Sequence, residues 1–140
     1  APLHRLPPSV SHPSDYDDIL VGWWKDWRWE PPTRDFLPDN GEGGFIVYDE
    51  DVPVCAGFMY ITNSKVGWSE FIVSNINYRD KEKRNEALDL LIQSISIVLS
   101  DVGCRYVYTS LKNKSLVNAY ARNGFVKGSE GCTEMVKIWQ

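Results

Sequence analysis

The chain has 140 residues, 43% of them hydrophobic and 24% charged, with a formal charge of −4 and a pI of about 5.1. This composition is typical of one soluble domain, so we expect a single domain over residues 1–140. No stretch approaches the roughly 18 consecutive apolar residues that a membrane helix needs. The excess of acidic residues argues against binding to a phosphate backbone. We therefore expect neither a membrane nor a nucleic acid as a partner.

The N-terminal segment and the cysteines indicate a compartment. Residues 1–5, Ala-Pro-Leu-His-Arg, lack the charged-then-apolar layout of a signal peptide, so we expect a cytoplasmic protein. Cys55, Cys104 and Cys132 have no metal-ligand spacing and lie among apolar or small residues. We expect buried, reduced thiols and no metal.

The first half of the chain predicts a short strand, a helix and three further strands. Residues 1–14 are rich in proline and hold at most one strand near Leu3–Leu6, and Ser14 is a candidate N-cap for a helix from Asp15 to about Trp27. Apolar residues at helical spacing favour packing of that helix in the core, and an aromatic floor for a ligand, with Trp29 at its edge, is the alternative. The apolar residues of this helix are Tyr16, Ile19, Leu20, Trp23, Trp24 and Trp27. The three strands expected after it are Gly44–Tyr48, Val54–Thr62 and Trp68–Ser74.

The second half predicts two helices and three strands. Apolar residues in one stripe indicate a helix over Ala87–Leu99, followed by Gly103 just past its end. A strand at Arg105–Leu111 and a second, shorter helix follow. Segments Phe125–Lys127 and Cys132–Trp139 are typical of a closing hairpin.

The shorter helix carries the most informative pattern of the chain. Asn113 stands at its start, Leu116 and Tyr120 share one face, and Gly124 takes the stop position before Phe125. Taken singly, Asn113 is an ordinary N-cap residue and Tyr120 an ordinary half-buried tyrosine.

Together, the Asn, the Tyr two turns later and the Gly-Phe pair resemble the C-terminal signature of the GNAT superfamily of N-acetyltransferases. The order of elements resembles that family over essentially the whole chain. The resemblance implies an α/β (α+β) fold with a mixed, mostly antiparallel sheet that splays between its fourth and fifth strands, where acyl-CoA lies. The family's second helix is replaced here by a loop over residues 31–43.

The chain is also similar to small acetyltransferase-like proteins from bacteriophages. The shared features are a tryptophan-rich first helix, a Leu-Pro pair before the second strand and a Val-Ser-Asn ending on the fourth. For a phage-encoded protein the location implied is the host cytoplasm.

The GNAT resemblance implies an acetyl-CoA-dependent transfer to an amine on a small molecule or a protein. Tyr120 would give its proton to the thiolate of coenzyme A, and Asn113 would bind the pantetheine or phosphate arm. Glu70 would act as the base, although a lone Glu on a strand is also common at a solvated face. Backbone N–H groups of Ile72 and Val73 would polarise the thioester carbonyl, with Ser74 nearby, and alternation places Glu70, Ile72 and Ser74 on one face.

The charged segment over residues 78–87 is the candidate phosphate site. A strand, a turn and a helix N-terminus favour anions, because the first helical N–H groups lack partners and the dipole there is positive. The family's glycines are missing, and a solvated charged loop capped by Glu86 is the alternative. The residues predicted to bind the cofactor here are Lys83, Arg84, Asn85, Glu86 and Ala87.

These departures keep other functions open. A non-catalytic GNAT-fold protein that binds acyl-CoA or a host partner would tolerate both the missing glycines and the missing second helix. An enzyme acting on nucleic acid bases or on a lysine of a host protein is a third possibility.

Overall fold

A five-stranded mixed sheet forms the centre of the molecule in a computed structural model that describes residues 4–5 and 15–139. The strands lie side by side in chain order, and β1 to β4 are antiparallel while β5 runs parallel to β4. Such a sheet matches the fold expected from the sequence. Its strands are β1 (His4–Arg5), β2 (Gly44–Asp49), β3 (Val52–Ile61), β4 (Val66–Ser74) and β5 (Tyr106–Tyr108).

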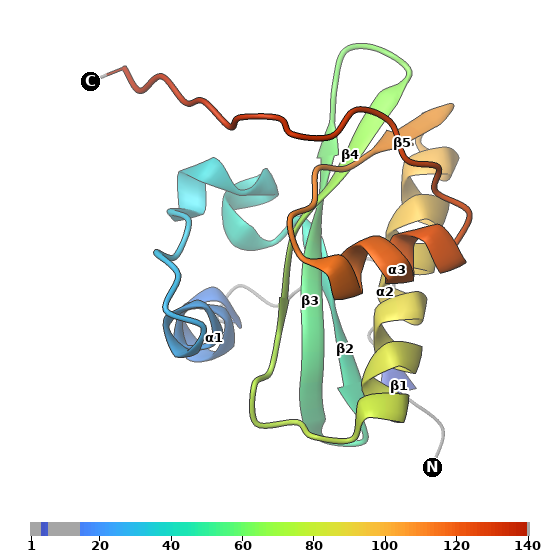
Figure 1. Cartoon of the computed structure of the whole chain (residues 1–140). Helices are drawn as coiled ribbons and strands as arrows, with labels where there is room; N and C mark the ends of the chain where they lie inside the picture. The colour runs from blue at the N-terminus through green and yellow to red at the C-terminus, as the bar shows by residue number, and fades with distance from the viewer. Residues whose placement is uncertain (1–3, 6–14, 140) are drawn as a thin grey trace.

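Helices cover both faces of this sheet. A π-helical turn (Tyr16–Leu20) leads into α1 (Val21–Asp26), and both lie on one face. The long helix α2 (Lys81–Asp101) and the short helix α3 (Lys114–Arg122) lie together on the other (Figure 1). None of the helices in the described part of the chain is long and apolar enough to cross a bilayer.

Each face of the sheet has its own apolar core. On the α2 side, Leu91, Ile92 and Ile95 have no exposed surface and pack with residues of β2, β3 and β4. On the α1 side, Leu20, Trp23 and Trp24 are buried against the sheet, which confirms the core interpretation of the first helix for these residues. Trp27 is the exception, since 38% of its surface remains exposed.

The connection between α1 and β2 contains two short 3-10 turns, Arg34–Phe36 and Pro38–Gly41. Residues 31–43 therefore form no α-helix, as the sequence predicted. The first of these turns brings Phe36 over the sheet, where its carbonyl oxygen accepts a hydrogen bond of 2.8 Å from the Tyr60 hydroxyl.

Helix α2 begins six residues earlier than the apolar stripe predicted. Asp80 caps it, accepting a hydrogen bond from Lys83 N at 3.1 Å. The polar residues 81–86 are compatible with a solvated first turn and a half, so the apolar stripe marks only where the helix becomes buried. Strand β1 (His4–Arg5) lies in the middle of the strand expected near Leu3–Leu6, and Ser14 lies outside the described residues.

The last third of the chain departs furthest from expectation. Strand β5 spans only three residues, and no strand forms within residues 125–139, so the predicted closing hairpin is wrong for this structure. Because β5 has only three residues, a further strand would find little backbone there with which to pair. Cys132 is accordingly exposed, whereas Cys55 is buried as predicted and Cys104 is half-buried, and all three are free thiols.

Candidate active site

Strands β4 and β5 separate after three residue pairs. The ladder joins Val66 to Tyr106, and it ends where Trp68 meets Tyr108. Beyond that point side chains take over from the backbone: the Thr109 hydroxyl donates to the Ser69 carbonyl oxygen at 2.6 Å, and Ser110 N donates to Glu70 Oε1 at 2.7 Å. The rest of β4, from residue 69 to residue 74, has no β5 partner. This is the splay that the sequence predicted.

Tyr120 lies where the two strands part. Its hydroxyl oxygen is 2.6 Å from Ser69 Oγ, and only 2% of its surface is exposed. Asn113 caps α3 and fixes its start, accepting from Ser115 N at 2.8 Å and Leu116 N at 3.2 Å. Phe125 packs edge-on against the Tyr120 ring, with the ring centroids 4.9 Å apart. The phenol is therefore held by both ends of its helix.

The surroundings of Tyr120 keep its proton in place. Burial raises the pKa of this phenol above its ordinary value, and hydrogen bonds with Ser69 and Thr109 oppose that rise. The nearby Glu70 carboxylate raises the pKa further. A phenol that remains protonated at neutral pH can act as an acid.

Glu70 faces the other side of the sheet. It pairs across the ladder with Phe58, which belongs to the core on the α1 side, whereas Ser69 faces α3. The backbone at Phe71 has a φ of +55°. The register between β3 and β4 also shifts at this point of the strand. This irregularity breaks the alternation, so Ile72 joins the core on the α2 side. The expectation that Glu70, Ile72 and Ser74 share one face is therefore wrong for Glu70, whereas Ser74 pairs with Cys55 and faces the α2 side together with Ile72.

The Glu70 carboxylate is half-buried and well bonded. Besides Ser110 N, the hydroxyl of Thr109 lies 3.4 Å from the same oxygen, Oε1. Burial raises the pKa of this carboxyl, the hydrogen bonds from Ser110 and Thr109 lower it, and the charge of Glu134 raises it again. Glu70 thus ties the segment after β5 to β4 and also provides a carboxylate with a raised proton affinity.

The remaining residues predicted on β4 lie along its unpaired part. Ile72 and Val73 are buried on opposite faces of the sheet. The Ser74 carbonyl oxygen accepts a hydrogen bond of 2.8 Å from Trp27 Nε1, which attaches the end of α1 to the end of β4.

The predicted phosphate residues lie in the first turns of α2 and not in a loop. Asn85 is helical, so it does not take the left-handed conformation by which an Asn could replace one of the family's missing glycines, and Ala87 is completely buried. The Lys83 ammonium lies 3.8 Å from Asp49 Oδ2. A carboxylate, Asp80, already bonds the helix N-terminus. This end of the site is therefore less open to an anion than the sequence suggested.

Sequence reasoning missed three residues that build the site: Ser69, Thr109 and Ser110. Ser69 has no exposed surface despite its hydroxyl, and it lies two residues after the buried Gly67. Two small residues on the inward face of an otherwise apolar strand were the available signal, because they leave room for a large side chain from a neighbouring element. Thr109 and Ser110 gave no such signal, since they follow a strand whose end the sequence placed later.

The fold resembles solved acetyltransferases. One similar structure is a protein of unknown function from methicillin-resistant Staphylococcus aureus, a probable acetyltransferase. The match covers 99% of this chain and 100% of that chain, with a TM-score of 0.66 and 17% identity. N-acetylglutamate synthase from Neisseria gonorrhoeae, complexed with coenzyme A and L-arginine, matches 94% of the chain over 29% of its own, with a TM-score of 0.66 and 13% identity.

An aminoglycoside acetyltransferase from an uncultured soil metagenomic sample, in complex with sisomicin, matches 99% of the chain over 96% of its own. Its TM-score is 0.63 and its identity 10%. No protein-family model and no curated protein sequence matches the chain. At these identities the likeness establishes the fold alone: the chain has a GNAT-like mixed sheet flanked by helices.

Proposed function

We propose that this protein is an N-acyltransferase that moves an acetyl group from acetyl-CoA to an amine by direct attack. One observation carries the proposal. A buried phenol, Tyr120, meets Ser69 at the point where β4 and β5 of a GNAT-like sheet part. Similar structures include acetyltransferases, among them one bound to coenzyme A and one bound to an aminoglycoside, which supports both the cofactor and an amine acceptor.

The residues that would surround the thiol end of coenzyme A suit the cofactor better than those that would surround its phosphates. Between Ser69 and Ser74, the side of β4 that faces β5 has no neighbouring strand, so its backbone amides suit an extended pantetheine arm. Among them, the N–H groups of Ile72 and Val73 are those predicted to polarise the thioester carbonyl. Asn113 at the start of α3 is the expected polar contact on the facing side. At α2, the Asp80 carboxylate competes with phosphate for the same N–H groups, and Lys83 and Arg84 supply the positive charge.

Acetyl-CoA supplies an activated thioester whose thiol departs when an amine attacks. The protein's share of the chemistry falls on two groups that lie on opposite faces of β4. Tyr120 holds a proton at its hydroxyl for the departing thiol, and a Ser69 hydroxyl that donates to the phenol oxygen would stabilise it once the proton has gone. Glu70 receives the proton that the amine must lose, and its raised pKa makes it a stronger base than an ordinary glutamate.

A second candidate is a non-catalytic protein that has kept the scaffold. The Asp80 cap and the hydrogen bond from Ser110 N to Glu70 favour it, because both place carboxylates in structural roles. The location in the cytoplasm and the likeness to bacteriophage proteins stay predictions under either function.

Two measurements on the full chain separate these functions. Calorimetry with acetyl-CoA measures cofactor binding, and release of free thiol in the presence of a broad amine panel measures transfer. The proposal expects both. Binding without amine-dependent thiol release would favour the non-catalytic protein, and the absence of binding at near-millimolar acetyl-CoA would exclude the enzyme.

A further inference from the structure

Aromatic side chains follow the Glu70 face of β4. Phe36 meets Phe71 edge-on at 5.5 Å between ring centroids, and Tyr60 lies 6.2 Å from Phe71. Further along the strand, Trp27 stacks on Trp29 at 5.9 Å. We call these five residues the aromatic strip. They come from the end of α1, from the turn after it and from β3 and β4, so only the folded chain brings them together.

The strip is both open to solvent and held in place. The exposed fractions are 47% for Phe36, 47% for Trp29 and 38% for Trp27. Yet Trp27 is anchored through its indole N–H to the Ser74 carbonyl, and Tyr60 through its hydroxyl to the Phe36 carbonyl. These bonds fix the Trp27 ring, the Tyr60 ring and the backbone at Phe36. Rings whose surroundings are fixed in this way lose little conformational entropy when a ligand covers them, which is the property of a recognition surface.

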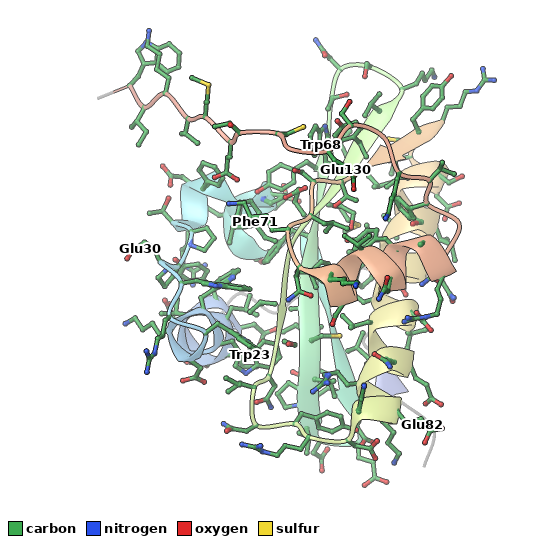
Figure 2. All side chains as sticks on the ribbon, in the orientation of Figure 1. Trp23, Glu30, Trp68, Phe71, Glu82 and Glu130 are labelled. Carbon is green, nitrogen blue, oxygen red and sulfur yellow. The ribbon has the colours of Figure 1, made fainter. Side chains whose placement is uncertain are left out.

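The backbone at Phe71 supports a role beyond packing. A φ of +55° is costly for a residue with a bulky side chain, by roughly 1–2 kcal/mol. As a result, the side chains of Glu70 and Phe71 lie on the same face of the sheet, the one that α1 covers, although the residues are neighbours in sequence. Figure 2 shows Phe71 on that side, with Trp68 further toward the end where the strand begins and Glu82 at the far end of the molecule. The strain therefore sets a carboxylate beside an aromatic ring.

The charge next to Phe71, at the Glu70 end of the strip, is negative. Glu134 of the C-terminal segment lies close enough to Glu70 to raise the pKa of its carboxyl. None of the ion pairs formed between residues 15 and 139 involves either glutamate. Two carboxylates without a cationic partner, next to exposed aromatic faces, attract a cation that also carries apolar surface.

We propose that the acceptor is a primary amine carried on a planar aromatic group. Its ring packs on the aromatic strip at Phe36 and Phe71, and its ammonium lies at Glu70, with Glu134 adding to the attraction. This inference rests on the proposed function, because it assigns the acceptor side of the same site. A purely aliphatic or a sugar amine lacks the flat π-face that this surface offers.

Three probes of nearly equal size test the assignment by calorimetry on the full chain without coenzyme A. They are 2-phenylethylamine, 2-cyclohexylethylamine, which lacks the π-system, and 3-phenylpropanoate, which reverses the charge. Offset or edge-on ring pairs contribute about 0.5–1.5 kcal/mol, so we expect 2-phenylethylamine to bind about twofold to tenfold more tightly than the cyclohexyl probe. The phenylpropanoate should not bind measurably. Equal binding of the two amines, preference for the anion, or no binding of any probe at millimolar concentration would overturn the proposal.

A pair of variants keeps the test specific. Phe36→Leu removes an exposed ring of the strip while keeping apolar surface, and it should abolish the preference for 2-phenylethylamine over its cyclohexyl counterpart. Tyr106→Leu, at an exposed ring on β5, is the control and should leave that preference intact. An unchanged preference in Phe36→Leu would contradict the proposal. A separate titration with acetyl-CoA reports on the proposed function, so failure of cofactor binding and failure of the aromatic preference are seen independently.

Discussion

The hydroxyl oxygens of Tyr120 and Ser69 lie 2.6 Å apart, although the residues are 51 positions apart in the chain. Both side chains are buried, so the bond lies in surroundings of low polarity, where an unpaired hydroxyl is unfavourable. The same pair closes the site on the α3 side of β4. Packing and chemistry therefore depend on one contact, and substitutions must be designed to separate them.

Tyr120→Phe removes the proposed acid and keeps the ring that packs on Phe125. We expect the rate of acyl transfer to fall by about 10²-fold to 10⁴-fold, the usual contribution of a positioned acid. Affinity for acetyl-CoA should change little. Steady-state kinetics together with calorimetry provide the check, and a variant with the turnover of the wild type would remove Tyr120 from the mechanism.

A double-mutant cycle on Ser69 and Tyr120 measures the contact itself. Tyr120→Phe leaves the buried Ser69 hydroxyl without the phenol, and Ser69→Ala leaves the phenol with Thr109 alone, so each single change should lower the free energy of unfolding, by roughly 1–3 kcal/mol where a hydroxyl is left unpaired. The double variant leaves neither, so its loss should be clearly smaller than the two single losses added together. Denaturant unfolding gives these values. Additive losses would show that the two hydroxyls do not interact in solution.

Glu70→Gln separates the base from the tether, because glutamine keeps a carbonyl oxygen that can accept from Ser110 N. The base form of Glu70 exists above its pKa, and burial raises that pKa. The rate of transfer by the wild type should therefore rise with pH through a midpoint above the ordinary pKa of glutamate, about 4.3. The Glu70→Gln variant should lose this rise with pH. Glu70→Ala should in addition destabilise the fold. A pH–rate profile that Gln leaves unaltered would clear Glu70 of the base role.

Asp80→Asn tests whether the start of α2 receives phosphate. Asparagine caps helices as well as aspartate does, so stability should hold while a negative charge is lost beside the first N–H groups. Charges near a helix N-terminus contribute about 0.3–1 kcal/mol, so we expect acetyl-CoA to bind about twofold to fivefold more tightly. Calorimetry measures the change. Unaltered affinity would place the phosphates elsewhere.

The order of elements could be predicted because it depends on local patterns. The glycine stops after α2 and α3 adopt the positive φ that such positions favour, 104° at Gly103 and 90° at Gly124. The start of α2 was missed because residues 81–86 have no apolar phase. The closing hairpin was expected from the β-like residues of 125–127 and 132–139, but a strand needs a partner, and sequence periodicity does not show whether one is available.

The site could be predicted only in part, for a related reason. Tyr120 was expected because the run from Asn113 to Phe125 resembles the GNAT signature, which lies within one short segment. Its partner Ser69 and the tether between Glu70 and Ser110 join segments that are 51 and 40 residues apart, and no local pattern encodes them. The side of the sheet that Glu70 faces depends on the backbone at Phe71, where alternation fails. A positive φ at a phenylalanine has no signature in the sequence.

Backbone amide NMR of the full chain during titration with acetyl-CoA tests the central claim most directly. We expect shifts that concentrate on residues 69–74 of β4 and on the first turn of α3, the helix that carries Tyr120. Residues 44–49 of β2, which β3 separates from β4, should stay unchanged. Shifts confined to other parts of the chain, or none at millimolar acetyl-CoA, would contradict the proposal that the parting of β4 and β5 is an acyl-CoA site.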